Sequence, residues 1–269
     1  MNLDDLIALA FAAGREIMAV RAAGFDAQIK NDGSLVTIAD QRAETIIEAR
    51  LAELAPGVPM LGEEAVAAGR VADCRGEFFC VDPLDGTRGF AKGGDEFTVN
   101  IALVEAGTPT IGVVYAPATG ELYAGEPGKA LAAKYNPQTA QFIEPARPIS
   151  ANATLPARPK IVASDFSGRN ERTGAFINAL SGAITHASSS IKFCRIAEGA
   201  ADLYPRFGDV SEWDAAAGHA ILRAAGGDIM LLDGSPLVYG GRNGDFLVHG
   251  FVAYSGDEAK QAALAALKR

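Results

Sequence analysis

The segment VDPLDGT, residues 81–87, has the most chemically specific pattern in the chain. Asp82 and Asp85 directly follow an apolar run. Two carboxylates at a strand end can share hard cations, and the Leu84 carbonyl can add another oxygen. Such ligands suit Mg²⁺ or Mn²⁺ better than Zn²⁺, and Gly86 permits an unusual backbone dihedral. By spacing alone, an ordinary Asp-Gly turn explains the segment equally well.

Acidic residues occur at two other places where apolar segments begin or end. Glu63 and Glu64 follow a short apolar segment, and Asp214 follows Trp213 at the start of a helical pattern. Taken singly, Asp214 is explained as a helix N-cap or first-turn acid, and the glutamates as a solvated pair. Taken together they change the interpretation, because a binuclear metal site gathers carboxylates from separated segments.

Three motifs at these positions resemble a known family. GEE (62–64), DPLDGT (82–87) and WDAAAGHA (213–220) are similar to the metal-binding signatures of the inositol monophosphatase superfamily of Mg²⁺-dependent, typically lithium-sensitive phosphatases. Two longer segments, 97–117 and 189–208, resemble its 3'(2'),5'-bisphosphate nucleotidases, which hydrolyse adenosine 3',5'-bisphosphate to AMP in sulfate assimilation. The resemblance covers nearly the whole chain.

The resemblance implies a mixed α+β and α/β fold, a two-lobed layered αβαβα sandwich of the inositol monophosphatase and fructose-1,6-bisphosphatase type. The active site would lie between the lobes. The stretch 145–160 is rich in Pro and Ala and has no apolar period. We therefore expect an N-terminal lobe over residues 1–148 and a C-terminal lobe over 149–269.

The resemblance also implies a set of metal ligands. The first Mg²⁺ would be held by Glu63, Asp82 and the Leu84 carbonyl, and the second by Asp82, Asp85 and Asp214. Asp82 would thus bridge the two ions. Family members often hold a third, weaker Mg²⁺ near the position of Glu63.

The same resemblance assigns the reacting groups. Asp40 and Thr87 match the pair that orients the attacking water, with Glu63 beside it, and the backbone of Gly86 and Thr87 would cradle the scissile phosphate. Asp40 also has a structural explanation, because it ends a capping box that Thr37 begins. The two explanations do not conflict.

A second phosphate requires fixed positive charge away from the metals. Lys192 and Arg206, with Ser189, match positions that contact the nucleotide in related enzymes, although surface charge explains such residues equally well. Arg88 is a weaker candidate. Lys30 resembles a family lysine near the metals, although a flexible, solvated lysine explains it almost as well. The expected substrate contacts are Glu63, Leu84, Asp85, Gly86, Thr87, Ser189, Lys192, Arg206 and Asp214.

Two segments depart from the nucleotidase pattern. Related enzymes often read DGTKEF where this chain has DGTRGF, so Gly89 replaces an acid. They also often carry an SRSH-like stretch where this chain reads SDFSGRN (164–170), with Asp165 in place of Arg. These differences bear on nucleotide recognition and leave the metal ligands intact.

Periodicity predicts the elements that must position these residues. In the N-terminal half we expect helices over 2–22 and 37–54, then strands over 77–81, 97–104, 110–116 and 121–125, the second and third of them antiparallel. In the C-terminal half, a mixed sheet with helices is expected. Its strands are 160–164, 183–187, 201–207, 228–232 and one over 246–254, and its helices are 170–180, 189–199, 213–225 and a closing helix from about 256. Within the 213–225 helix, Trp213 should anchor in the core and His219 should be a packed core histidine.

Composition limits the classes of partner. Lys and Arg number 24 against 33 Asp and Glu, a net charge of −9, which argues against nucleic-acid polymers. Three cysteines without CxxC spacing suit a reducing cytoplasm. No apolar run is long enough for an integral membrane segment. Mg²⁺ would reverse the local charge and admit a small phosphorylated metabolite.

Three functional hypotheses follow. The leading one is a Mg²⁺-dependent 3'(2'),5'-bisphosphate nucleotidase. The alternative is an inositol-1-monophosphatase or related small-phosphomonoester phosphatase of the same superfamily. A third, from another class, is a non-catalytic sensor of a phosphorylated metabolite, which the complete ligand set disfavours. A monomer and a homodimer are both compatible with the sequence.

Overall fold

The computed structural model describes most of the 269-residue chain. The described residues are 2–29, 35–137, 139, 141–164, 170–241 and 245–268. Within these ranges, no helix combines the length and apolarity that a membrane span requires. Lys30 and Asp165, which the sequence singled out, lie outside the described residues.

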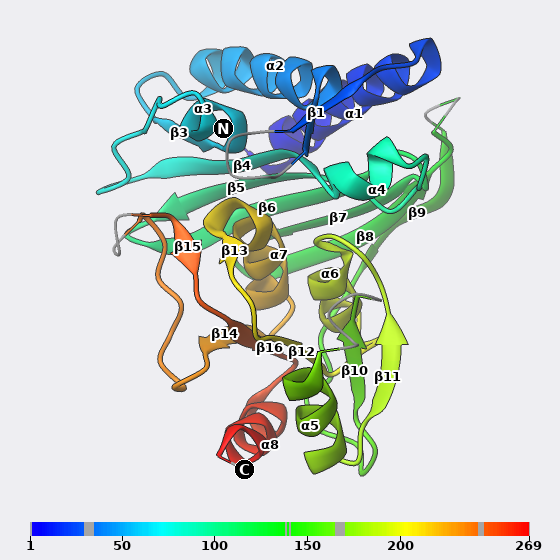
Figure 1. The fold of residues 1–269 in the computed structure, drawn as a ribbon, viewed down its shortest axis with the longest axis vertical. Coiled ribbons are helices and arrows are strands. Elements are labelled where there is room, and N and C mark those ends of the chain that lie inside the picture. The colour runs from blue at the N-terminus through cyan, green and yellow to red at the C-terminus, as the bar shows by residue number, and fades with distance from the viewer. Residues whose placement is uncertain are drawn as a thin grey trace.

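Helices and sheets alternate in five layers (Figure 1). Helices α1 (Leu3–Ala23) and α2 (Ile38–Leu54) cover one face of a seven-stranded sheet. Helices α6 (Ile191–Ala197) and α7 (Glu212–Ala224) lie between that sheet and a five-stranded one. Helices α5 (Glu171–Ala179) and α8 (Asp257–Leu267) cover the other face of the five-stranded sheet. This is the expected αβαβα sandwich.

The seven-stranded sheet runs in the order β3-β4-β5-β6-β7-β8-β9. Its β3–β4 pair is parallel and every later pair is antiparallel, including the predicted β5–β6 pair. The bounds are β3 Met60–Gly62, β4 Phe78–Asp85, β5 Thr98–Glu105, β6 Thr108–Ala116, β7 Glu121–Glu126, β8 Lys129–Tyr135 and β9 Phe142–Pro148.

The five-stranded sheet is mixed, as expected, in the order β11-β10-β12-β16-β14. The β11–β10 and β10–β12 pairs are parallel, and β16 is antiparallel to both of its neighbours, β12 and β14. The bounds are β10 Lys160–Ala163, β11 Ala183–His186, β12 Leu203–Arg206, β14 Asp228–Leu231 and β16 Phe251–Tyr254. The short elements are β1 Ala27–Ile29 paired with β2 Leu35–Thr37, β13 Val210–Ser211 paired with β15 Leu247–Val248, and the helices α3 Glu63–Ala67 and α4 Thr87–Ala91.

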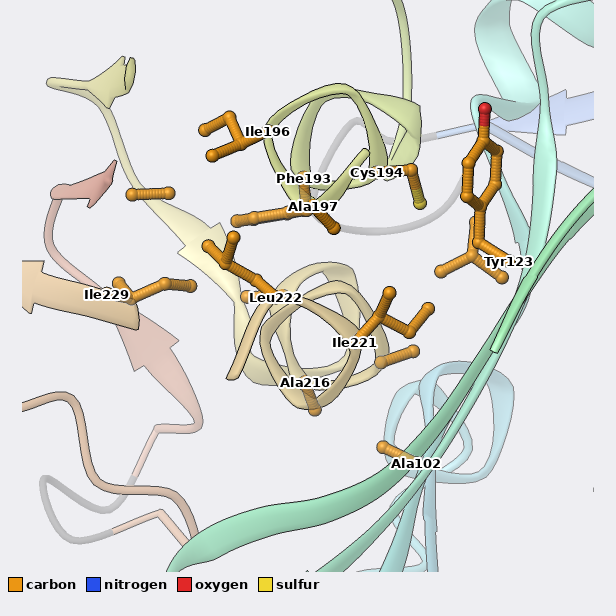
Figure 2. Packing of buried hydrophobic residues seen from close by; sticks show 14 of the residues in the cluster. Ala102, Tyr123, Phe193, Cys194, Ile196, Ala197, Ala216, Ile221, Leu222 and Ile229 are labelled. Atoms are coloured by element: carbon orange, nitrogen blue, oxygen red, sulfur yellow. The ribbon is translucent and has the colours of Figure 1, made fainter. Parts of the chain in front are cut away.

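Alternation along the strands divides the apolar residues into separate cores. On β5, Ile101 packs beneath α1 and α2, whereas its neighbour Ala102 faces α6 and α7. Figure 2 shows this second core, where Phe193 and Leu222 pack between the two helices. The far face of the five-stranded sheet packs Leu203 against α5 and α8.

Helix α7 lies unusually close to the seven-stranded sheet. Its sequence is rich in alanine, and Gly112 of β6 faces it. A Cβ added to Gly112 would overlap the backbone oxygen of Ala217 and lie 2.8 Å from the Ala220 Cβ. Small residues on both sides therefore let the helix backbone approach the strand.

The structure corrects several sequence-based expectations. The single strand over 246–254 is wrong: β15 and β16 are separate, and Gly250 between them has φ +88°. The stretch from 145 was expected to be irregular, but β9 continues through Pro148. Strands β1, β2, β3, β8, β9 and β13 were not predicted. The division of the chain at 148/149 stays a prediction.

Candidate active site

The segment that carries Asp82 and Asp85 was expected to follow a strand, but both residues lie within β4. The pairing of β4 with β5 shifts register between them, as in a bulge. The backbone N–H of Leu84 donates to the Asp82 Oδ1 at 2.9 Å, which closes a local turn. Asp82 is buried and Asp85 partly buried, so the end of this strand places two carboxylates where water has little access.

Helix α7 brings a third carboxylate to the same place. Asp214 forms a capping box with Ser211, whose N–H donates to the Asp214 Oδ2 at 2.9 Å. Asp82, Asp85 and Asp214 each offer an oxygen, and these oxygens all lie within 4.8 Å of one another. The predicted convergence of these two motifs is thus seen in the structure.

The three carboxylates repel one another in a largely buried site. Burial, followed by the charge of Glu63, raises the pKa of Asp82 well above its usual value. Burial and the charge of Asp85 raise the pKa of Asp214 to about 7. Burial also raises the pKa of Asp85. A hard divalent cation would relieve this repulsion, and a donor set made only of oxygens fits Mg²⁺.

Glu63 and Leu84 lie near the three carboxylates of Asp82, Asp85 and Asp214 but are not part of that closely spaced group. Glu63 begins α3, and its charge acts on both Asp82 and Asp214. The Leu84 carbonyl accepts a hydrogen bond from the Thr87 hydroxyl at 3.0 Å. A carbonyl oxygen has a second lone pair, so this bond leaves it able to bind a cation.

Asp40 and Thr87 are brought together, as the resemblance implied. The Thr87 hydroxyl lies 2.9 Å from the Asp40 Oδ1. The backbone N–H and hydroxyl of Thr37 donate to the Asp40 Oδ2 at 2.8 and 2.7 Å, which completes the predicted capping box. Gly86 precedes α4 with φ +100°, a left-handed conformation that favours glycine.

A cleft of about 660 Å³ opens beside the carboxylates. Of the expected substrate contacts, it is lined by Asp85, Gly86, Ser189, Lys192, Arg206 and Asp214. Arg88 and Gly89 line it too, whereas Glu63, Leu84 and Thr87 are not among its lining residues. Aromatic rings of Phe193, Tyr204 and Phe251 add apolar surface.

The predicted basic residues are held by backbone carbonyls. The Lys192 Nζ donates to the Ser189 carbonyl at 2.6 Å, and burial lowers its pKa to about 8. Arg206 donates to the carbonyls of Gly208 and Asp209 at 3.3 and 3.0 Å. The Ser189 hydroxyl lies 3.0 Å from the Asp85 carbonyl. Both cations are therefore fixed at the cleft wall.

Sequence reasoning missed two residues that tie the site together. Ser190 is buried, and its hydroxyl lies 2.9 Å from the Asp214 carbonyl and 3.3 Å from the Asp85 Oδ2. The Asn100 amide donates to that hydroxyl at 2.9 Å. The available signal was Asn100 itself, an amide within the mostly apolar run 97–104.

Two neighbouring residues have the expected structural roles. Trp213 is buried in the core between the sheets. The His219 ring nitrogens lie 3.1 Å from the Tyr239 hydroxyl and 2.6 Å from the Asp228 Oδ1. His219 is therefore a core histidine with both nitrogens partnered.

Comparison with known proteins identifies the family. The model of the inositol monophosphatase family matches residues 2–268. The protein named 3'(2'),5'-bisphosphate nucleotidase CysQ from Salmonella typhimurium is 41% identical over 251 residues, covering 93% of this chain and 98% of its own. The protein of the same name from Shigella flexneri is 40% identical over 252 residues, which again cover 93% of this chain and 98% of its own.

Solved structures agree with this placement. The crystal structure of CysQ from Bacteroides thetaiotaomicron, described as a bacterial member of the inositol monophosphatase family, has a TM-score of 0.73 and 33% identity, covering 96% of this chain and 98% of that one. The suhB structure from Bartonella henselae, at 24% identity, shares the fold with a TM-score of 0.75, covering 99% and 98%. This chain is therefore a member of the inositol monophosphatase family.

Proposed function

We propose that the protein is a Mg²⁺-dependent 3'(2'),5'-bisphosphate nucleotidase that hydrolyses adenosine 3',5'-bisphosphate to AMP and phosphate. The observation that carries the proposal is the meeting of Asp82, Asp85 and Asp214 within 4.8 Å, beside a cleft lined by Lys192 and Arg206. The names of the CysQ relatives supply the substrate class.

The carboxylates account for the metal requirement. We assign one ion to Glu63, Asp82 and the Leu84 carbonyl, a second to Asp82, Asp85 and Asp214, and a third, weaker one to the neighbourhood of Glu63. When bound, Mg²⁺ offsets the negative charge of the phosphate and makes water in the site more acidic.

The side chains of Asp40 and Thr87 orient the attacking water. Asp40 is fixed by Thr37 and in turn orients the Thr87 hydroxyl, whose lone pairs can accept a hydrogen bond from water. Glu63 aims the same water. Attack forms a bond from the water oxygen to phosphorus as the bond to the 3'-oxygen breaks. The attacking water gives up one proton to solvent, and the departing 3'-oxygen takes up one proton from solvent. The backbone of Gly86 and Thr87 holds the phosphate.

Lys192 and Arg206 bind the other phosphate, with Ser189 beside them. Both cations line the cleft and are held by backbone carbonyls, so little side-chain entropy is lost when an anion binds. Arg206 can contact phosphate through two N–H groups at once.

Substrate preference tests the proposal directly. Phosphate release from adenosine 3',5'-bisphosphate should exceed that from inositol 1-phosphate, and it should require Mg²⁺. Asp82→Asn should abolish Mg²⁺-dependent turnover, because Asp82 would be a ligand of both assigned ions. Preference for inositol phosphate would favour the alternative activity, and turnover that persists in Asp82→Asn would refute the metal assignment.

The role of Arg206 has its own test. Arg206→Gln should raise the KM for adenosine 3',5'-bisphosphate about 10–100-fold, the cost of one charged hydrogen-bonding partner. Adenosine 3'-monophosphate, which lacks the second phosphate, is the matched control and should be hydrolysed as before. Equal losses with both substrates would show that Arg206 does not recognise the second phosphate.

We also assign the enzyme to the reducing cytoplasm, because Cys74, Cys80 and Cys194 are free thiols. A small phosphorylated metabolite is its partner, and the net charge of −9 disfavours polyanions.

A further inference from the structure

Glu44 is a buried carboxylate that neither the metal motifs nor the substrate contacts include. It lies on α2, one helical turn after Asp40, and is 2% exposed. Its Oε2 accepts the backbone N–H of Glu64 at 2.8 Å, and its Oε1 accepts that of Ala65 at 2.6 Å. Each carboxylate oxygen therefore holds one N–H of the first turn of α3.

The helix that Glu44 holds begins with Glu63. Helix α3 spans only Glu63–Ala67, too short to be stable alone. The orientation of Glu63 therefore depends on what fixes this turn. We propose that Glu44 is a positioning residue for the metal site, which sets Glu63 against Asp82 through α3. This inference rests on the metal site of the proposed function.

Close packing at Gly62 supports the assignment. Gly62 precedes α3, and a Cβ added there would lie 2.8 Å from both the Cδ and the Oε2 of Glu44. Its φ of −115° and ψ of 149° are open to any residue. The Glu44 carboxylate therefore occupies the space that a side chain at residue 62 would need. The proposal can be tested by changing either residue, Glu44 or Gly62.

The first variant is Glu44→Gln. Glutamine has nearly the same shape but offers one acceptor, so its amide N–H₂ would oppose one backbone N–H. Binding of Mn²⁺ to the free protein, followed by electron paramagnetic resonance, should weaken about 10–100-fold. Turnover at saturating Mg²⁺ should also fall, because Glu63 aims the attacking water in the proposed function and is displaced with the metal site.

The matched control is Asp202→Asn. Asp202 is 1% exposed and accepts the backbone N–H of Lys160 at 2.7 Å, at the opposite end of β12 from Arg206. The Asp202→Asn variant should have a lower melting temperature and an unchanged affinity for Mn²⁺. This control separates a positioning effect from a general loss of stability.

If Glu44→Gln does not fold, Gly62→Ala decides, because it displaces the Glu44 carboxylate without removing it. Folded Glu44→Gln or Gly62→Ala protein with wild-type affinity for Mn²⁺ would overturn the inference and leave the proposed function standing. Wild-type protein that binds no Mn²⁺ would overturn the metal site and this inference together.

Discussion

Asp40 illustrates how one side chain can serve the fold and the site together. Its two oxygens have different partners: Oδ2 accepts from Thr37 and caps α2, while Oδ1 lies against the Thr87 hydroxyl. Burial raises the pKa of Asp40, and the Thr37 hydrogen bonds oppose that shift. The structural and the catalytic explanation are therefore compatible, because they use different atoms.

Metal affinity should depend on pH through Asp82 and Asp214. The pKa of Asp214 is raised to about 7 and that of Asp82 is also raised, so both must lose protons before they bind a cation. As the pH falls below 7, the Mg²⁺ concentration for half-maximal activity should rise, by up to about tenfold per pH unit for each displaced proton. Activity measured against Mg²⁺ at several pH values checks this, and a pH-independent Mg²⁺ requirement would contradict it.

The same raised pKa values make the stability of the metal-free protein depend on pH. In the folded state, Asp82 and Asp214 keep protons that they lose near pH 4 in the unfolded state, because about 4 is the usual pKa of Asp. The free energy of unfolding should therefore decrease as the pH rises from about 4 to about 7. Urea unfolding with and without Mg²⁺ should show the ion stabilising the protein more at pH 8 than at pH 5. Equal stabilisation at both pH values would contradict this expectation.

At the scale of elements, α7 and α2 bring the separate motifs to one place. Helix α7 carries Asp214 and packs closely against the seven-stranded sheet at Gly112. Helix α2 presents Asp40 toward Thr87 and Glu44 toward α3, because residues four apart share a helix face. The position of the carboxylates therefore follows from helix packing.

A methyl group at Gly112 should disturb this packing. Gly112→Ala places a Cβ against α7 and should destabilise the protein by about 1–3 kcal/mol, with a weaker affinity for Mg²⁺ because Asp214 moves with the helix. Gly174→Ala in α5 is the control, since its Cβ meets nothing within 4 Å, and it should stabilise by about 0.5–1 kcal/mol. Thermal unfolding measures both. A Gly112→Ala protein as stable as wild type would show that α7 can shift at no cost.

At the scale of the whole molecule, the two predicted lobes share one core. Residues from the seven-stranded sheet, such as Ala102 and Tyr123, pack with α6, α7 and the five-stranded sheet (Figure 2). Tyr123 of the first sheet also receives a hydrogen bond from Arg195 of α6 at 2.6 Å. The N-terminal part alone would expose one face of its sheet.

We therefore expect fragment 1–148 not to fold alone. Its uncovered apolar face should drive aggregation, whereas co-expression with fragment 149–269 should restore a soluble complex. Size-exclusion chromatography and circular dichroism of both preparations test this. A monomeric fragment 1–148 that unfolds cooperatively would instead make the lobes independent folding units.

Local periodicity predicted much of the fold. Helices α1, α2 and α7 and strands β5 and β6 were expected within one or two residues of their bounds, since one buried face leaves a clear period. Strand β8 is rich in alanine, and β9 is exposed along its length, so neither shows a period. Their pairing comes from backbone hydrogen bonds, which depend little on the type of side chain.

The sequence by itself determined the family resemblance, the acidic motifs and the capping box of Asp40. Only the tertiary structure decided that Asp82, Asp85 and Asp214 meet within 4.8 Å, and that Asn100 and Ser190 support them. The physical reason is distance along the chain. Caps and turns depend on residues a few positions apart, whereas these contacts exist only once helices and sheets separated by about a hundred residues have packed.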